Sequence, residues 1–338
     1  MKTLVRAVNW LGDAVMCVPA LREVRAAFPD DEIVIVARPW VADLYAREPF
    51  CDRIIAYPKD AGVRGKWSLA TALREERFDR AILLQNAFDA ALIGWLARAK
   101  ERVGYARDGR SFLLTKPVER PLAGEIPEHQ RFYYLELLRR AGVIDELPEC
   151  ADIRLGGVPQ AKENGRSLWA ALGLPQGPWI GVSPGAAYGG AKRWLPERFA
   201  AAAERLADDL GARVAIFGSP AEADLAADIA NRIGARAYAL AGQTSLSDYI
   251  DLAATCSVYL TNDSGPMHVA AALGVPTVAV FGATDHIATG PSASWAKVVR
   301  QPVECSPCLL RECPIDHRCM TGVSVERVVR EAHALLSA

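Results

Sequence analysis

The sequence lacks an excess of charge of either sign. Its 338 residues include 39 Lys and Arg against 40 Asp and Glu, a formal net charge of −1. A protein dedicated to nucleic acid usually carries a large basic excess, so we exclude that class and expect no nucleic-acid partner. Hydrophobic residues make up 51% of the chain, which also excludes a disordered or fibrous protein.

A membrane-spanning segment is also missing. The longest stretch without Asp, Glu, Lys or Arg covers residues 264–284, nominally enough to cross a bilayer. It contains His268, Gly274 and Pro276, and we predict a helix, a turn and a buried strand instead. Polar and charged residues interrupt the apolar N-terminal stretch, so we expect no export signal and a cytoplasmic protein.

Three common phosphate-binding signatures do not occur where they would be needed. G-x-G-x-x-G does not follow the first predicted strand, which disfavours an NAD-dependent dehydrogenase. The glycine-containing loop near Lys192 does not have the spacing of a P-loop. No Asp-x-Asp occurs anywhere, so the chain offers no such carboxylate pair for a diphosphate-bound metal.

Short β-branched runs alternate with helical stretches in both halves of the chain. The predicted strands are 4–8, 32–37, 53–57, 81–85, 179–182, 213–217, 237–240, 258–260 and 277–281, and predicted helices include 20–28, 41–47, 69–77, 196–210 and 266–273. This alternation predicts an α/β fold with two Rossmann-like parallel sheets. We expect domains at 1–155 and 179–322, a linker region at 156–178 that contains a helix at 162–172, and a C-terminal helix within 323–338. Two such domains facing each other would share a cleft at the carboxyl ends of their strands.

Three segments that follow predicted strands could carry chemistry. Asp13 follows the first strand, where its carboxylate would either cap the next helix or act as a general base. Lys192 follows a loop of small residues, which is either an anion site or a solvated surface loop. The turn Asp263-Ser264-Gly265 starts a helix that carries His268, and we interpret it as a second anion site, the alternative being a structural histidine.

Together these segments resemble the bacterial heptosyltransferases of lipopolysaccharide core assembly, glycosyltransferase family 9. The resemblance covers nearly the whole chain and depends on the motifs N-W-L-G-D, S-P-G-A with K-R-W, N-D-S-G-P-M-H and F-G-A-T-D. It implies a fold of GT-B type, in which the first domain binds the acceptor and the second binds an ADP-sugar. By the same resemblance, catalysis requires no cofactor.

The resemblance also implies roles for individual residues. Asp13 matches the catalytic aspartate, and Lys192 matches the lysine on the donor diphosphate. The other matched donor-binding residues are Ser183, Gln243, Thr244, Asp263, Ser264, Gly265 and His268, with Glu222 as either a ribose contact or an acid in the first turn of a helix. For the anionic acceptor, the expected contacts are Asn9, Arg64, Lys66, Arg107 and Arg110, although a cation in such a run can equally belong to a solvated face.

The implied reaction is inverting transfer of a heptose from ADP-L-glycero-D-manno-heptose to the first heptose of a lipid A–Kdo–heptose acceptor. Asp13 would be the general base, and the enzyme would contact the inner face of the cytoplasmic membrane. The alternatives are transfer to another core acceptor, as by heptosyltransferase I or III, a nucleotide-sugar 2-epimerase of the same fold, and a non-catalytic nucleotide- or metal-binding scaffold. The oligomeric state does not follow from the sequence.

Four of the eight cysteines are scattered and four are clustered. We expect Cys17, Cys51, Cys150 and Cys256 to be small buried side chains. Cys305, Cys308, Cys313 and Cys319 have the spacing C-x₂-C-x₄-C-x₅-C. A structural zinc site, an iron–sulfur cluster, a disulfide pair and four free thiols are the alternatives for this cluster, and none of them has a catalytic part.

Overall fold

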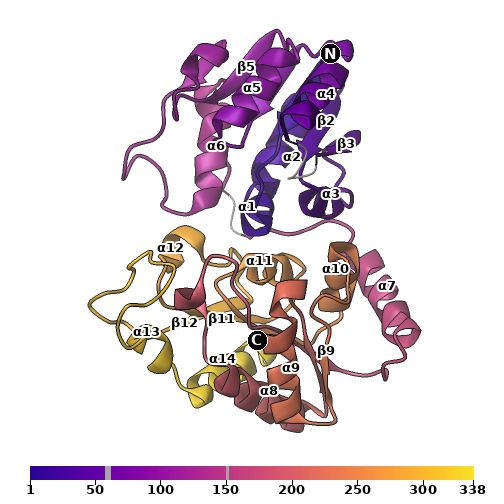
Figure 1. Ribbon diagram of the computed structural model, residues 1–338, viewed down its shortest axis with the longest axis vertical. Coiled ribbons are helices and arrows are strands. Elements are labelled where there is room, and N and C mark those ends of the chain that lie inside the picture. Colours follow the sequence, from indigo (N-terminus) through magenta and orange to yellow (C-terminus); the bar gives the residue numbers. More distant parts are fainter. Residues whose placement is uncertain (58–61, 150–151) are drawn as a thin grey trace. The chain divides into compact units, whose positions relative to one another are not determined.

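The computed structural model describes residues 1–57, 62–149 and 152–338, and Cys150 therefore lies outside the described residues. The chain divides into two compact units, Met1–Cys150 and Ala151–Ala338 (Figure 1). Each unit is an α/β layer structure with its own parallel sheet. The stretch 156–178, predicted as a linker region, contains α7 (Val158–Ala171), which packs within the second unit.

The first unit is built on a six-stranded sheet in the order β3-β2-β1-β4-β5-β6. Its strands are β1 (Lys2–Arg6), β2 (Glu32–Ala37), β3 (Arg53–Ala56), β4 (Arg80–Leu83), β5 (Glu101–Tyr105) and β6 (Lys116–Val118). All five pairings are parallel. In this Rossmann order the chain reverses its direction of travel between β1 and β4, which is where ligands bind in open α/β sheets.

Six α-helices cover this sheet: α1 (Leu11–Met16), α2 (Val18–Ala27), α3 (Pro39–Tyr45), α4 (Gly62–Glu75), α5 (Phe88–Leu96) and α6 (Gln130–Arg140). Helices α4 and α5 pack against each other, and α2 packs against α6. Alternate strand residues such as Leu4, Val34 and Leu83 join Leu73 of α4 and Ile93 of α5 in one hydrophobic cluster. This alternation follows from the two-residue period of a strand, which sends every second side chain to the same face.

The second unit repeats the topology of the first. Its strands are β7 (Trp179–Ser183), β8 (Arg213–Ile216), β9 (Ala237–Ala239), β10 (Val258–Asn262), β11 (Thr277–Phe281) and β12 (Ala296–Arg300). Their order, β9-β8-β7-β10-β11-β12, is again parallel throughout and matches the first sheet strand for strand. The reversal point now lies between β7 and β10.

The main α-helices of the second unit, besides α7, are α8 (Pro196–Leu210), α9 (Ala223–Ile233), α10 (Leu246–Ala254), α11 (Gly265–Ala272) and α14 (Val325–Leu336), with short α12 (His286–Thr289) and α13 (Arg318–Thr321). Helices α8, α9 and α14 share one hydrophobic cluster with the sheet. Helix α7 crosses α10 closely at Gly165, where a Cβ atom would lie 2.1 Å from the carbonyl oxygen of Asp251. Trp169 of α7 stacks on Trp179 of β7 with 4.0 Å between ring centroids.

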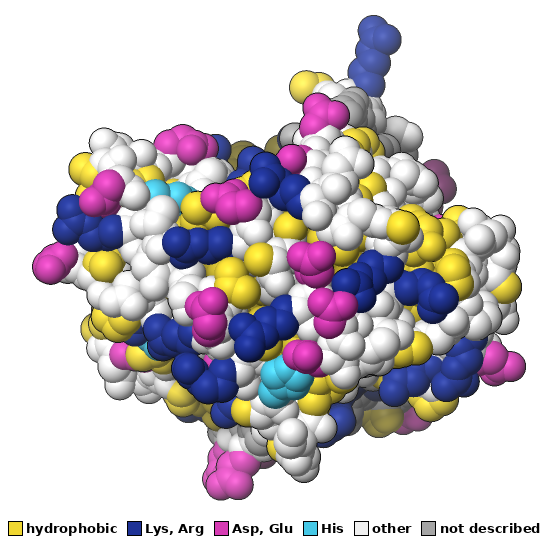
Figure 2. All heavy atoms as spheres, turned by 90° about the horizontal axis from the view of Figure 1, so that it is seen from below, with side chains coloured by type: hydrophobic (Ala, Val, Ile, Leu, Met, Phe, Trp, Pro, Cys, Tyr) yellow, Lys and Arg dark blue, Asp and Glu magenta, His cyan; other side chains and the backbone are white. Residues whose placement is uncertain are grey.

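The predicted strands are present, but β5, β6 and β12 were not predicted. All three carry charged residues, and β6 and β12 are edge strands, so they do not form the apolar runs that mark the buried strands. The uncharged stretch 264–284 folds as α11, a turn and β11, which confirms that prediction. Within the described ranges, no helix combines the length and apolar character needed to cross a bilayer. Cationic and anionic side chains are interspersed on the face seen in Figure 2.

Candidate active site

Asp13 lies at the carboxyl edge of the first sheet, in the first turn of α1. The N-cap of this helix is Trp10, so Asp13 is not the cap that the sequence allowed as an alternative. Its side chain is half-buried, and its Oδ1 accepts a hydrogen bond of 3.1 Å from the Tyr134 hydroxyl. Burial raises the pKa of Tyr134 well above its ordinary value, and the nearby Asp13 carboxylate raises it further. Tyr134 therefore stays protonated and holds the carboxylate in a fixed orientation.

Asn9 lies on the same loop as Asp13 and is fixed by two neighbours. Its Oδ1 accepts from Arg6 Nη2 at 3.0 Å, and its carbonyl oxygen accepts from Trp40 Nε1 at 2.8 Å. Arg6 is almost completely buried, and burial, together with the charge of Arg38, lowers its pKa to about 10. The loop after β1 is therefore tied to the first turn of α3.

Three predicted acceptor contacts lie on elements that begin or end at this edge. Arg64 and Lys66 belong to the first turns of α4. Lys66 Nζ pairs with Asp89 Oδ1 at 2.7 Å, whereas Arg64 is exposed. Arg107 follows β5 and donates from Nε to Asp108 Oδ2 at 3.1 Å.

Arg110 has a structural role that the sequence did not indicate. It is completely buried, and its Nε donates to the Tyr105 carbonyl oxygen at 3.0 Å. Its two terminal nitrogens donate to the Gln85 and Ala87 carbonyl oxygens and to Asn86 Oδ1. Burial lowers the pKa of its guanidinium. Arg110 joins the loop after β4 to the end of β5, and the prediction that it contacts the acceptor is corrected, because its donors are already engaged.

Lys192 and Asp263 form an ion pair at the carboxyl edge of the second sheet. Lys192 ends the 3₁₀ turn η2 (Gly190–Lys192), and its Nζ lies 2.6 Å from Asp263 Oδ2. The two side chains are 14% and 5% exposed. Lys192 Nζ also lies 4.9 Å from the ring centroid of Tyr188, and the Thr284 hydroxyl donates to Asp263 Oδ2. The structure thus brings together two residues that the sequence had assigned to the donor separately.

Asn262 fixes the two loops around this pair. It is completely buried at the end of β10, its Nδ2 donates to the Pro184 carbonyl oxygen at 2.6 Å, and its Oδ1 accepts from the Trp194 backbone N–H at 2.9 Å. One amide thereby connects the loop after β7 with the end of the Lys192 loop. Asn262 and Thr284 belong to two of the sequence motifs, but no role was predicted for either of them. No sequence pattern pointed to Tyr134 as a functional residue.

Ser183 lies at the end of β7, but its hydroxyl points into the protein. Its Oγ lies 2.7 Å from the Tyr259 hydroxyl, which donates to the Tyr249 hydroxyl at 3.1 Å. Tyr249 in turn donates to the Pro266 carbonyl oxygen at 3.3 Å. Because the Tyr259 proton is already used, Ser183 must be the donor of the first bond. This buried chain supports the first turn of α11.

The remaining donor-site candidates also lie at this edge. Ser264 is the N-cap of α11, and Gly265 and the buried His268 fall within its first turns. Gln243 and Thr244 directly precede Ser245, which caps α10. Glu222 forms a capping box with Ser219, as the alternative interpretation of that residue predicted. An added Cβ at Gly185 would lie 1.7 Å from Glu222 Oε1, so this carboxylate also reaches the loop after β7.

The cysteine-rich segment borders the Lys192 loop. The Ala191 N–H donates to the Arg311 carbonyl oxygen at 2.9 Å, and the Gly190 N–H donates to Glu312 Oε1 at 2.9 Å. Burial raises the pKa of Cys319, and the charges of Cys305, Cys313 and Cys308 raise it further, so the four thiols share one neighbourhood. Among the described residues, however, no group of three or more His, Cys, Asp or Glu is arranged to hold a metal ion. The structural metal site considered from the cysteine spacing is therefore not supported.

The scattered cysteines fit their expected role in part. Cys17 and Cys256 are buried thiols, whereas Cys51 is half-buried. Burial raises the pKa of Cys51 to about 11, so this thiol is not activated as a nucleophile.

The chain is similar to known proteins in both sequence and structure. The family model described as "Glycosyltransferase family 9 (heptosyltransferase)" matches residues 66–318. Lipopolysaccharide heptosyltransferase 2 of Salmonella typhimurium is 32% identical, with 100% of this chain and 99% of the relative covered. The solved structure of Escherichia coli ADP-heptose lps heptosyltransferase II superposes with a TM-score of 0.84 at 31% identity, covering 100% and 99% of the two chains. E. coli heptosyltransferase WaaC with ADP shares the fold at a TM-score of 0.77 and 18% identity, covering 99% and 100%.

Two Rossmann-like units with matching strand order define an α/β glycosyltransferase of the GT-B type. The chain belongs to glycosyltransferase family 9, the heptosyltransferases.

Proposed function

We propose that the protein transfers a heptose from ADP-L-glycero-D-manno-heptose to the first heptose of a lipid A–Kdo–heptose acceptor, at the inner face of the cytoplasmic membrane. The observation that carries this proposal is the ion pair of Lys192 and Asp263 beside the N-terminus of α11. The full-length likeness to heptosyltransferase 2 of two enteric bacteria supports the choice of acceptor.

On the donor side, Lys192 and the first turn of α11 meet the diphosphate. Departure of ADP places negative charge on the β-phosphate, which a fixed ammonium group and free helix N–H groups stabilise. Asp263 holds Lys192 in place before the donor arrives, with Nζ 2.6 Å from Oδ2. Gln243 and Thr244 contact the nucleoside, and Glu222 contacts the ribose with the carboxylate oxygen that faces Gly185.

On the acceptor side, Asp13 takes the proton from the attacking hydroxyl group. The oxygen attacks the anomeric carbon opposite the leaving diphosphate, so the configuration inverts in one displacement without a covalent intermediate. Tyr134 positions the carboxylate through its 3.1 Å hydrogen bond. Asn9, Arg64, Lys66 and Arg107 contact the phosphates and carboxylates of the acceptor.

The test is to incubate the enzyme with ADP-heptose and with acceptors that carry zero, one or two heptoses, and to identify the products by mass. We expect a single heptose to be added to the acceptor that already carries one. Addition to the acceptor without heptose, or to the one with two, would move the protein to another step of core assembly. Consumption of the sugar nucleotide without any acceptor would instead indicate a 2-epimerase.

A further inference from the structure

A charged cavity lies in the first unit, at the amino edge of its sheet. Its volume is about 310 Å³, and it is lined by Arg74, Arg77, Phe78, Ala97, Arg98 and Lys100. These residues end α4 and α5 and precede β4 and β5, whereas Asp13 and the predicted acceptor contacts follow the strands or begin helices at the opposite edge. The lining holds four cations and no acid.

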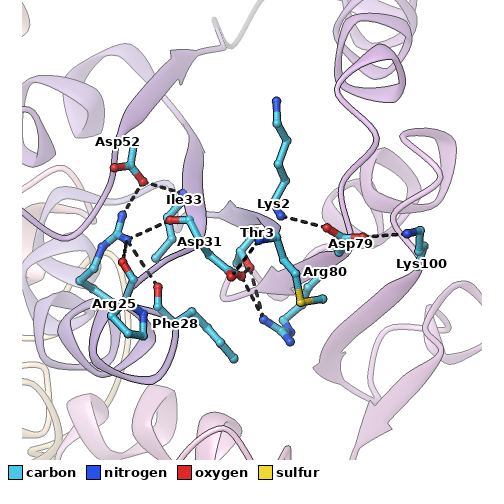
Figure 3. A network of polar contacts seen from close by, with 12 residues as sticks. Lys2, Thr3, Arg25, Phe28, Asp31, Ile33, Asp52, Asp79, Arg80 and Lys100 are labelled. Carbon is cyan, nitrogen blue, oxygen red and sulfur yellow. Dashed lines mark hydrogen bonds and ion pairs between the residues drawn. The ribbon is translucent and has the colours of Figure 1, made fainter.

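The charges of three of these cations are not balanced. Lys100 Nζ pairs with Asp79 Oδ1 at 2.7 Å, and Asp79 Oδ2 also accepts from the Lys2 backbone N–H at 3.0 Å (Figure 3). Arg74, Arg77 and Arg98 are exposed, and none of them forms an ion pair or side-chain hydrogen bond with another residue of the described ranges. Three guanidinium groups thus surround one cavity without a protein counter-ion.

Two of these arginines also hold an unusual backbone conformation. Arg77 and Arg98 both have φ of 56°, in the left-handed region that favours glycine. Each occupies the second position after the end of its helix, where a left-handed residue commonly stops a helix and is usually glycine. Helices α6, α7 and α11 have glycine at the corresponding position, namely Gly142, Gly173 and Gly274. Where the residue at this position is left-handed, it is glycine after α6, α7 and α11 but arginine after the two helices that border the cavity.

Stabilisation of the helix dipole does not explain this choice. A cation in the last turn of a helix interacts favourably with the dipole, and Arg74 fills that role in α4. The dipole gives no reason to place arginine in a conformation that suits glycine, twice, around one cavity. We propose that the cavity is a binding site for a small phosphorylated ligand, with Arg77 and Arg98 as its principal contacts.

The chemistry of the cavity favours a phosphate monoester. Guanidinium groups donate hydrogen bonds in a planar fork that matches phosphate oxygens. The three positive charges suit a doubly negative phosphate better than a singly negative carboxylate. The lining also includes Phe78 and Ala97, which are fully buried, so its accessible part consists of the four cations. The volume lies at the lower end of small-molecule sites, which suits a sugar-sized group.

The test is calorimetric titration of the full-length protein with inorganic phosphate and with glucose 6-phosphate, with and without ADP in excess. We expect one site for glucose 6-phosphate that ADP does not block, and no binding of glucose. The double variant Arg77→Gly/Arg98→Gly should weaken binding about a hundredfold, since each of the two charge-assisted contacts contributes about a factor of ten. The same variant should raise Tm by about 2 °C per site, because glycine suits the backbone there. Arg205→Ala, which removes an exposed arginine of α8, is the control.

Each outcome decides the proposal independently of the heptosyltransferase activity. Loss of phosphate binding together with higher Tm in the double variant would support it. Binding that survives the double variant, or that ADP blocks, would place the phosphate elsewhere and overturn it. Failure of both probes to bind would also overturn it. Binding of phosphatidylglycerol vesicles that the arginines control, without binding of either phosphate, would replace it with a membrane contact.

Discussion

The two units have the same strand order but differ in how they finish the carboxyl edge of the sheet. In the second unit, three polar side chains there are buried, with Asn262, Asp263 and His268 between 0% and 5% exposed, whereas Gln243 is exposed. In the first unit, Asp13 and Arg107 are half-buried, Arg64 is exposed, and Trp10 is 67% exposed. One scaffold therefore carries a closed polar site and an open one.

This difference suits the two substrates that we propose. Buried polar groups with full hydrogen bonding keep a fixed arrangement, so the second unit meets a small nucleotide-sugar with dipoles already in place. A large lipid-linked acceptor needs an edge that stays accessible, and the first unit leaves its carboxylate at such an edge.

The largest effect should come from the open edge. Asp13→Asn removes the general base and should lower kcat by about 10²–10⁴-fold. Because Asp13 belongs to the first unit, the affinity for ADP should not change, and calorimetry with ADP measures this separately. Asp43→Asn, which alters an exposed aspartate of α3, is the control. Near-normal turnover of Asp13→Asn would show that the first unit does not supply the general base.

At the closed edge, Lys192→Ala should lower kcat by about 10²–10³-fold, because a fixed group that stabilises the leaving diphosphate is lost. Asp263→Asn keeps the lysine but removes its counter-ion, so we expect a smaller loss of about tenfold. Lys297→Ala, at an exposed position on β12, is the control. An equal loss in both variants, with ADP affinity intact, would mean that the ion pair and not the lysine alone is the functional group.

The shared scaffold could be predicted from the sequence, whereas the difference between the two edges could not. Buried parallel strands appear as apolar runs, which is why most strands of both sheets were found. The residues that follow those strands were also found, because ligand sites in such sheets lie there. Lys192 and Asp263 are 71 residues apart in the numbering, and no local pattern predicts that they pair.

Arg110 is a second example of a feature that the sequence does not predict. In the sequence it is one cation in a basic run, and the run predicts a surface that binds anions. The fold instead places it at 0% exposure among backbone carbonyl groups. Burial depends on which loops surround a residue, and residue type alone does not determine this.

Each edge depends on one buried polar side chain, and removing it should cost stability. Arg110→Ala removes three hydrogen bonds to backbone carbonyl oxygens of the first unit and one to Asn86 Oδ1, and we expect the free energy of unfolding to fall by about 2–4 kcal/mol. Asn262→Ala leaves the Pro184 carbonyl oxygen and the Trp194 N–H of the second unit without this partner, and the free energy of unfolding should fall by about 1–3 kcal/mol. Chemical denaturation measures both, with Arg120→Ala at an exposed position as the control. If Arg110→Ala leaves the free energy of unfolding unchanged, Arg110 has no structural role and the prediction that it contacts the acceptor is restored.

The smallest expected effect tests whether Tyr134 positions the Asp13 carboxylate at the open edge. Tyr134→Phe removes the hydroxyl that donates to Asp13 but keeps the ring, which packs edge-on against Tyr133. We expect kcat to fall by about 3–10-fold, the value of one typical hydrogen bond. Without this donor the carboxylate takes up a proton more readily, so the acid limb of the pH–rate profile should move to higher pH. Activity measured across pH separates this effect from a general loss of folded enzyme.

Tyr105→Phe provides the matched control for that experiment. Tyr105 is also a buried tyrosine of the first unit, and its hydroxyl donates to the Tyr133 carbonyl oxygen at 2.7 Å. Both variants lose one buried hydrogen bond, so both should lose similar stability, but the acid limb should move in Tyr134→Phe alone. If both variants leave the pH profile in place, Tyr134 only packs, and the open edge presents its carboxylate without a positioning residue. A shift in Tyr134→Phe alone would show that the open edge, like the closed one, holds its reacting group before the substrate arrives.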